Sequence, residues 1–216
     1  MSVKKSVNPF DRIPPYRIIP NFLGNDLIDH LLEHARAREL DFVSTRVGKE
    51  QRIDPKIRVS QVLRDFGSLR EELDERFRAV MSDAITDLRI TPFGLAKCEI
   101  EMVAHNNGAF YKQHIDTRTG HLDEKTQRVL TGVLYFHSVP KGFSGGQLRL
   151  HAFSSPEERE HFVDIEPERD NFVLFPSWAP HEVLPISCPS VEFAQSRFAI
   201  NCWYRRANPH KGIPSE

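Results

Sequence analysis

Two residues two positions apart, His114 and Asp116, are the first candidates for chemistry in this sequence. Alternate side chains of an extended strand leave the same face, so we expect these two to point together and Ile115 to point the opposite way. An imidazole and a carboxylate then converge on one point. If His181 arrives from a distant strand, the set becomes two histidines and one carboxylate, which can hold a non-haem ferrous ion with open coordination positions.

Two later residues complete this set. His181 directly follows the proline-bounded loop 176–180 and directly precedes a predicted strand. Arg197 lies on the last long predicted strand, on the same face as Asn201 and Trp203. A guanidinium that points into an apolar barrel needs an anionic partner, because burying an unpaired charge is very costly. We therefore expect a metal site beside an anion-binding pocket.

Two helices are predicted to come first in the chain. One begins at Asn25 as its N-cap and carries an apolar stripe at helical spacing. The other begins at a capping box formed by Ser68 and Glu71 and continues to Leu88. Between them, 41–54 reads as a loop and 57–63 as a short strand with Arg58 and Ser60 on one face.

After Pro92 the sequence changes to short strands separated by turn signals. Eight such strands indicate a β-sandwich closed as a double-sheet jelly roll. They are predicted at 95–103, 110–116, 128–136, 147–151, 162–165, 171–175, 182–186 and 196–203. The expected fold is therefore α+β and mainly β: a double-stranded β-helix core over about 95–206, with a helical cover over about 22–90 packed on one sheet. We expect a single domain over 1–216.

The amino-acid composition limits the classes of partner that we expect this protein to bind. The chain has 29 Lys plus Arg against 30 Asp plus Glu, so net charge favours neither nucleic acid nor a membrane surface as the partner. No apolar stretch is long enough to span a bilayer, so we expect a cytoplasmic protein. The cysteines at 98, 188 and 202 are too scattered for a disulfide framework and are expected to be reduced core residues. The oligomeric state stays open.

A competing motif lies in the first helix, where His30, Glu33 and His34 match H-x-x-E-H, a zinc-peptidase signature in reverse order. At about 100° per residue these three side chains fall opposite the apolar stripe. A metalloprotease must bury its metal in a cleft. We therefore interpret the motif as a solvated polar face.

As an ordered set, the later motifs resemble the Fe(II)/2-oxoglutarate-dependent dioxygenases, and among them the prolyl-hydroxylase-like branch, over about 95–204. The residues that carry the resemblance are His114-x-Asp116, the strand from Arg128 to Tyr135, Ser144-Gly145-Gly146, Ile165-Glu166-Pro167, Pro180-His181-Glu182-Val183 and the strand from Arg197 to Tyr204.

The resemblance implies a role for each matching residue. His114, Asp116 and His181 would hold Fe(II), and Arg197 would pair with the distal carboxylate of 2-oxoglutarate. Tyr135 would donate to the same carboxylate. Asn201 and His105 are further candidates for the co-substrate pocket, although His105-Asn106-Asn107 stands where related hydroxylases carry a tyrosine. An insertion around Cys188 is a second departure and could alter the rim of the site.

The resemblance also implies a reaction: O2 and 2-oxoglutarate are consumed, succinate and CO2 are released, and an unactivated C–H bond is hydroxylated, with ascorbate as a supporting reductant. It favours a prolyl residue in a protein or peptide as substrate. A free amino acid or small metabolite is an alternative substrate, and a non-catalytic jelly-roll binding module is an alternative function. Arg58, Ser60 and the loop 41–54 are candidates for part of the entrance, because of their polarity.

Overall fold

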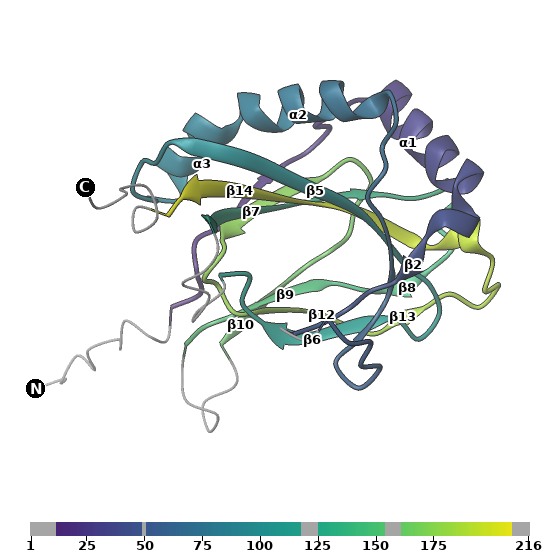
Figure 1. Ribbon diagram of the computed structural model, residues 1–216. Coiled ribbons are helices and arrows are strands. Elements are labelled where there is room, and N and C mark those ends of the chain that lie inside the picture. The colour runs from purple at the N-terminus through teal and green to yellow at the C-terminus, as the bar shows by residue number, and fades with distance from the viewer. Residues whose placement is uncertain (1–11, 49–50, 118–124, 154–160, 209–216) are drawn as a thin grey trace, which may run out of the picture.

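A computed structural model of the chain describes residues 12–48, 51–117, 125–153 and 161–208. Its core is a pair of β-sheets that face one another, with helices on the outer side of the larger sheet (Figure 1). This is the double-stranded β-helix predicted from the strand pattern, and the fold prediction is confirmed.

The larger sheet runs through the centre of the molecule. Its long central strands β7, β14 and β5 pair antiparallel over most of their length. In spatial order its seven strands are β1 (Arg17–Ile19), β11 (Phe172–Pro176), β7 (Thr126–Phe136), β14 (Arg197–Ala207), β5 (Leu95–His105), β4 (Gln61–Leu63) and β2 (Val43–Ser44).

The smaller sheet has five strands, and a two-stranded ladder closes one end of the barrel. In spatial order the smaller sheet contains β10 (Phe162–Ile165), β9 (Leu148–His151), β12 (His181–Val183), β6 (Phe110–His114) and β3 (Arg58–Val59); the ladder pairs β13 (Ile186–Ser187) with β8 (Ser144–Gly145). Because β6 and β12 are neighbours here, segments far apart in the sequence lie side by side (Figure 1).

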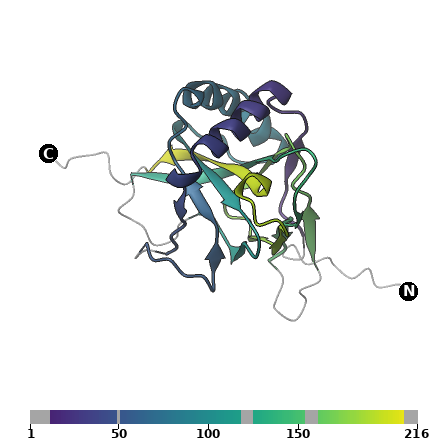
Figure 2. The same ribbon diagram turned by 90° about the vertical axis from the view of Figure 1, so that its right-hand side faces the viewer.

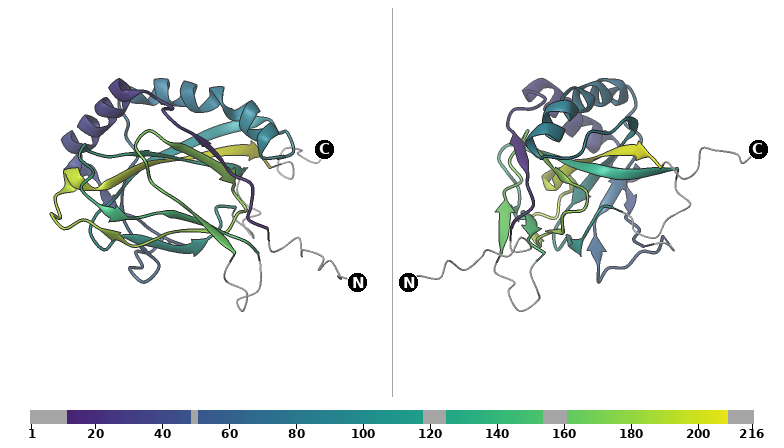
Figure 3. Two further views of the ribbon diagram at one scale, coloured as in Figure 1. Left: turned by 180° about the vertical axis from the view of Figure 1, so that it is seen from behind. Right: turned by 90° about the vertical axis from the view of Figure 1, so that its left-hand side faces the viewer.

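Three helices cover the outer face of the larger sheet (Figures 2 and 3). They are α1 (Asn25–Ala37), α2 (Leu69–Ala79) and α3 (Met81–Asp87); the short 3-10 turns η2 (Glu39–Asp41) and η4 (Phe193–Gln195) add to the edges. Leu31 of α1 and Phe77 of α2 are completely buried and belong to one apolar cluster with Phe172 and Ile200 of the sheet. The predicted helical cover on one sheet is therefore present.

The predicted helix ends were wrong in detail. Gly24, not Asn25, caps α1, and the backbone N–H groups of Leu23 and Gly24 donate to the Asp170 carboxylate, each at 2.8 Å. Asp170 comes from a turn far along the chain, so a tertiary contact replaces the local cap. Ser68 is the N-cap residue of α2, as predicted, but it makes no side-chain cap hydrogen bond.

The second predicted helix is two helices. Val80 both ends α2 and caps α3, with backbone angles that still lie in the helical region. The apolar stripe continues across this break, with Phe77, Ala84 and Leu88 all buried. The apolar side of both helices therefore stays on the sheet, and the spacing of apolar residues did not reveal the break.

The stretch 57–63 is two strands in different sheets. β3 pairs with β6 in the smaller sheet, whereas β4 pairs with β5 in the larger one. Ser60 lies at the corner between them, and Arg58 Nε donates to its hydroxyl at 2.9 Å. The preceding stretch, predicted to be a loop, contains β2 and an isolated bridge between Val47 and Arg52.

The three cysteines are free and buried, as predicted. Cys98 and Cys202 lie on neighbouring strands with their sulfur atoms 3.3 Å apart. None of the helices in the described ranges is long and apolar enough to cross a membrane.

Candidate metal and co-substrate site

The two candidate histidines lie opposite one another in the smaller sheet. His114 is the last residue of β6, His181 is the first residue of β12, and the two are register partners. Asp116 lies just beyond the end of β6, where the backbone N–H groups of Asp116 and Thr117 both donate to the Ser177 carbonyl at 2.9 Å. The loop before His181 therefore holds the carboxylate in place, rather than strand alternation alone.

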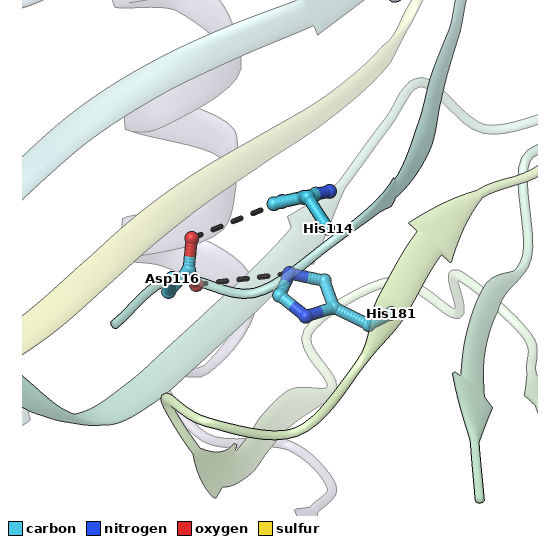
Figure 4. A group of neighbouring side chains, drawn as sticks. All are labelled: His114, Asp116 and His181. Atoms are coloured by element: carbon cyan, nitrogen blue, oxygen red, sulfur yellow. Dashed lines mark ion pairs between the residues drawn. The ribbon is translucent and has the colours of Figure 1, made fainter. Parts of the chain in front are cut away.

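The three side chains converge (Figure 4). Nε2 of His114 lies 3.8 Å from Oδ1 of Asp116, and Nε2 of His181 lies 3.7 Å from Oδ2. One ligand atom from each residue lies within 4.8 Å of the other two, and no second group of this kind occurs in the described part of the chain. The set offers two nitrogens and one oxygen, the donors of a facial ferrous site.

Backbone contacts set the tautomer of each imidazole. Nδ1 of His114 donates to the Lys112 carbonyl and Nδ1 of His181 to the Ala179 carbonyl, both at 2.9 Å. The Nε2 atoms are then unprotonated and face the centre, as metal ligation requires. Thr131 donates its hydroxyl to Asp116 Oδ2 at 2.9 Å and orients the carboxylate.

The ionisation of these groups suits a cation. Burial opposes the charge on Asp116, but the facing His181 and His114, together with Arg128, outweigh it and lower its pKa to about 2. Burial and the neighbouring His181 lower the pKa of His114 to about 3. At neutral pH the site therefore presents a carboxylate and a neutral imidazole, the forms that bind metal.

Arg197 occupies the inner face of the larger sheet and is 1% exposed. Among the described residues no carboxylate lies within the 4 Å of an ion pair, and its Nη1 donates to His105 Nδ1 at 3.3 Å. The Tyr135 hydroxyl, His105 Nε2 and Arg197 Nε are all buried without a partner in this part of the structure. A completely buried cation surrounded by unused hydrogen-bonding groups is a built site for an anion.

The two main hydrogen-bond donors of this pocket, the Tyr135 hydroxyl and the Arg197 guanidinium, stay protonated. Burial raises the pKa of Tyr135 to about 12. Burial lowers the pKa of Arg197, but a guanidinium starts so far above neutrality that it keeps its charge. Gly146 leaves room for this side chain: its φ is +73°, and a Cβ there would lie 2.7 Å from Arg197 Cδ. Gly146 therefore has a packing role beside the buried guanidinium.

One cavity of about 440 Å³ contains both the triad and this pocket. Asn201 and Trp203 also line it, as does His105. The structure thus brings together all seven residues singled out from the sequence: His105, His114, Asp116, Tyr135, His181, Arg197 and Asn201.

Several lining residues were not singled out from the sequence. Thr131 could have been found, because it shares strand parity with Tyr135. Tyr111 could not, since β12 pairs with β6 out of register near it, and its ring stacks on His114 with centroids 3.6 Å apart. Arg128 lies 3.6 Å over the ring of Trp203, which the sequence placed on the same strand face as Arg197.

The competing zinc motif does not form a site in the structure. His30 and Glu33 are exposed on α1, and Nε2 of His34 bonds to the Asp65 carbonyl at 3.0 Å. These residues are absent from the converging donor group of the described chain. The interpretation as a solvated polar face agrees with this geometry.

Comparison with known proteins shows which families this chain resembles. Residues 100–205 match the model of the 2OG-Fe(II) oxygenase superfamily. An uncharacterised PKHD-type hydroxylase of Synechocystis is 31% identical over 198 residues, which are 88% of this chain and 63% of that protein. Human Egl nine homolog 1 is 33% identical over 103 residues, 45% of this chain and 20% of that protein. The chain thus spans less than two thirds of the length of these relatives.

Solved structures share the fold. A prolyl-4-hydroxylase of Pseudomonas putida superposes with a TM-score of 0.65 at 24% identity, covering 88% of this chain and 92% of that one. A prolyl hydroxylase of Trichoplax adhaerens, in complex with a hypoxia inducible factor peptide, gives 0.65 at 23% identity, covering 88% and 83%. The chain is thus similar over residues 100–205 to the 2OG-Fe(II) oxygenase superfamily and shares the fold of these prolyl hydroxylases. Its His-Asp-His set supplies the donors of a ferrous site.

Proposed function

We propose that this protein is an Fe(II)- and 2-oxoglutarate-dependent dioxygenase that hydroxylates an unactivated C–H bond of a prolyl residue in a protein or peptide, with release of succinate and CO2. The observation that carries the proposal is the placement of two complementary sites in one cavity. A triad of metal donors faces it from the smaller sheet, and the buried Arg197, without a carboxylate partner in the described residues, faces it from the larger sheet.

In this proposal the triad holds the metal. Nε2 of His114, Nε2 of His181 and a carboxylate oxygen of Asp116 are the ligand atoms. Fe(II), when bound there, supplies the activation of O2 that side chains cannot provide. The carbonyls of Lys112 and Ala179 hold the two rings in the ligating tautomer, so the site is organised before the metal arrives.

The pocket on the larger sheet holds the co-substrate. Arg197 pairs with the distal carboxylate of 2-oxoglutarate through its planar fork, and the Tyr135 hydroxyl donates to the same group. Nδ1 of His105 accepts from Arg197, so its proton is on Nε2, which becomes a further donor into the cavity. Asn201 lines the same pocket and is the fourth co-substrate contact.

The prolyl substrate rests on the relatives. The structural neighbours from Pseudomonas putida and Trichoplax adhaerens are named as prolyl hydroxylases, and the second was solved with a peptide. Hydroxylation of a free amino acid or small metabolite is the alternative within the same chemistry. A non-catalytic binding module would have no need for a buried guanidinium with an unused Nε and two further unused donors beside it, which is why we favour an enzyme.

Aerobic incubation with Fe(II), ascorbate and 2-oxoglutarate tests the proposal. We expect succinate release that depends on added prolyl peptides, and a +16 mass shift on proline. Asp116→Ala is expected to bring both to background because it removes the anionic ligand.

The matched control is His30→Ala, which changes an exposed histidine of the unused motif and should behave as wild type. If only free proline is hydroxylated, the substrate is a small molecule and not a prolyl residue in a peptide. A wild-type protein that neither binds Fe(II) nor releases succinate would exclude the oxygenase.

A further inference from the structure

The cavity contains a second nearly buried arginine that the co-substrate does not need. Arg58 is on β3, at the edge of the smaller sheet, and lines the same cavity as the triad. Its side chain is 10% exposed. Nε is engaged by the Ser60 hydroxyl at 2.9 Å, which holds the guanidinium in place.

Arg58 is poorly neutralised by the protein. Its one carboxylate neighbour among the described residues is Glu101, whose Oε1 lies 3.9 Å from Nη2, beyond hydrogen-bond distance. The other oxygen of Glu101 accepts from Arg64 at 3.2 Å, so this carboxylate is shared between two cations. The Arg64 side chain is 67% exposed, whereas that of Arg58 is 10% exposed.

The carboxylate of Glu99 cannot neutralise the charge on Arg58 either. Glu99, two residues before Glu101 on β5, accepts from Arg128 at 2.8 Å and also pairs with Arg205. Two carboxylates on this wall thus serve four arginines, namely Arg58, Arg64, Arg128 and Arg205. Asp116 lies 3.8 Å from Arg128, but as a metal ligand it is committed elsewhere.

Arg58 also lies close to the metal ligands. Its guanidinium is 4.6 Å from the centroid of the Tyr111 ring, and that ring stacks on the His114 imidazole at 3.6 Å with 21° between the planes. A group bound at Arg58 is therefore separated from a metal ligand by a single aromatic ring. The exposed Arg46, which also lines the cavity, adds positive charge on the approach.

We propose that Arg58 is a receptor for a carboxylate of the primary substrate, next to the carbon that is hydroxylated. This rests on the proposed function, which assigns 2-oxoglutarate to Arg197 and leaves Arg58 for the second substrate. A buried guanidinium is the side chain that best matches a carboxylate, through two parallel hydrogen bonds. The carboxylate belongs either to an acidic side chain beside the target prolyl residue or to the α-carboxylate of a C-terminal or free residue.

Binding to protein loaded anaerobically with Mn(II) and 2-oxoglutarate tests this inference. The probes are three fluorescent prolyl peptides: one with Glu beside the proline and a blocked C-terminus, one with Gln at that position, and the Gln peptide ending in a free prolyl carboxylate. We expect one acidic probe to bind at least about tenfold more tightly than the neutral one. Which probe gains affinity identifies the source of the carboxylate.

Arg58→Gln should bring this ratio close to one, and Arg58→Lys, which keeps the charge, should retain part of it and shows that the site still folds. Arg149→Gln is the matched control, because that arginine pairs with Asp164 outside the cavity. Equal affinity for all three probes, or a preference that survives in Arg58→Gln, would overturn the proposal.

The outcome is separable from that of the proposed function. If the Glu peptide, the Gln peptide and the peptide with a free prolyl carboxylate are all hydroxylated on proline with equal kcat/KM, the Arg58 inference fails and the prolyl hydroxylase stands. If an acidic probe binds in an Arg58-dependent manner but no prolyl peptide is hydroxylated, the carboxylate receptor stands and the prolyl substrate is wrong.

Discussion

Two completely buried tyrosines on neighbouring strands of the larger sheet have opposite surroundings. Tyr204 of β14 faces the helices, and its hydroxyl donates to the Phe77 carbonyl of α2 at 2.7 Å. Tyr135 of β7 faces the cavity, and its hydroxyl has no partner within the described residues. A buried hydroxyl that is left unpaired costs stability, so the second tyrosine implies a partner that the chain itself does not provide.

The same contrast holds for the two faces as wholes. On β14, Ile200, Cys202 and Tyr204 pack in the helix-covered cluster, whereas Asn201 and Trp203 line the cavity. The helix face is apolar and stabilises the fold. The cavity face carries polar groups held ready for ligands, an arrangement that favours binding at some expense of stability.

The largest expected difference between an effect on ligand binding and an effect on stability comes from Arg197→Met. Removing the guanidinium that is proposed to pair with the distal carboxylate of 2-oxoglutarate should raise the KM for 2-oxoglutarate by about 100-fold or more, since a bidentate charged contact is lost. The free energy of unfolding should be unchanged or higher, because a buried charge without a carboxylate partner is replaced by an apolar chain. Steady-state succinate assays and urea unfolding measure the two quantities.

Phe77→Leu is the reciprocal change on the helix face. It should lower the free energy of unfolding by about 1 kcal/mol through poorer packing and leave the KM for 2-oxoglutarate unaltered. A large loss of stability in Arg197→Met would show that the cavity face is structural, which contradicts the comparison.

The same substitution at each of the two tyrosines tests the difference between the cavity face and the helix face. Tyr135→Phe should raise the KM for 2-oxoglutarate by about tenfold, because the proposed contact to the co-substrate is lost. It should leave stability within about 0.5 kcal/mol, because the hydroxyl has no hydrogen-bond partner among the described residues. Tyr204→Phe should lower stability by about 1–2 kcal/mol, because the Phe77 carbonyl loses its donor, with the KM unaffected. Matching effects in the two variants would mean that the faces do not differ as described.

The last test of the two faces uses the pH dependence of stability. Burial and the cations Arg197 and Arg58 hold the pKa of His105 well below its usual 6.5. Below about pH 6.5 the unfolded chain therefore binds a proton that the folded chain does not, and stability falls as the pH falls.

His105→Asn should make this pH dependence shallower by up to about 1.4 kcal/mol per pH unit, measured by urea unfolding between pH 7 and pH 5 without 2-oxoglutarate. Tyr204→Phe, on the other face, should keep the wild-type slope. An unchanged slope in His105→Asn would show that this histidine is protonated in the folded state.

Much of the fold and site was predictable because it follows from local pattern. Strand periodicity after Pro92 indicated the jelly roll, and the residue types at 114, 116, 181 and 197 indicated a metal site beside an anion pocket. The helix ends were not predictable in the same way. Asn25 and Ser68 have the residue types of caps, but the carboxylate of Asp170 binds the start of α1 instead. A contact across more than a hundred residues leaves no local trace.

The sequence by itself determined the strand-rich class, the donors available to the metal and the arginine available to an anion, since these depend on residue type and on the two-residue period of a strand. Only the tertiary structure decided how the donors meet: Ser177 holds Asp116 beyond the strand end, and β12 sets His181 opposite His114. It also decided which arginines lack carboxylates, because charge balance depends on three-dimensional neighbours. For that reason Arg58, merely a polar residue beside a strand in the sequence, becomes a candidate substrate receptor in the fold.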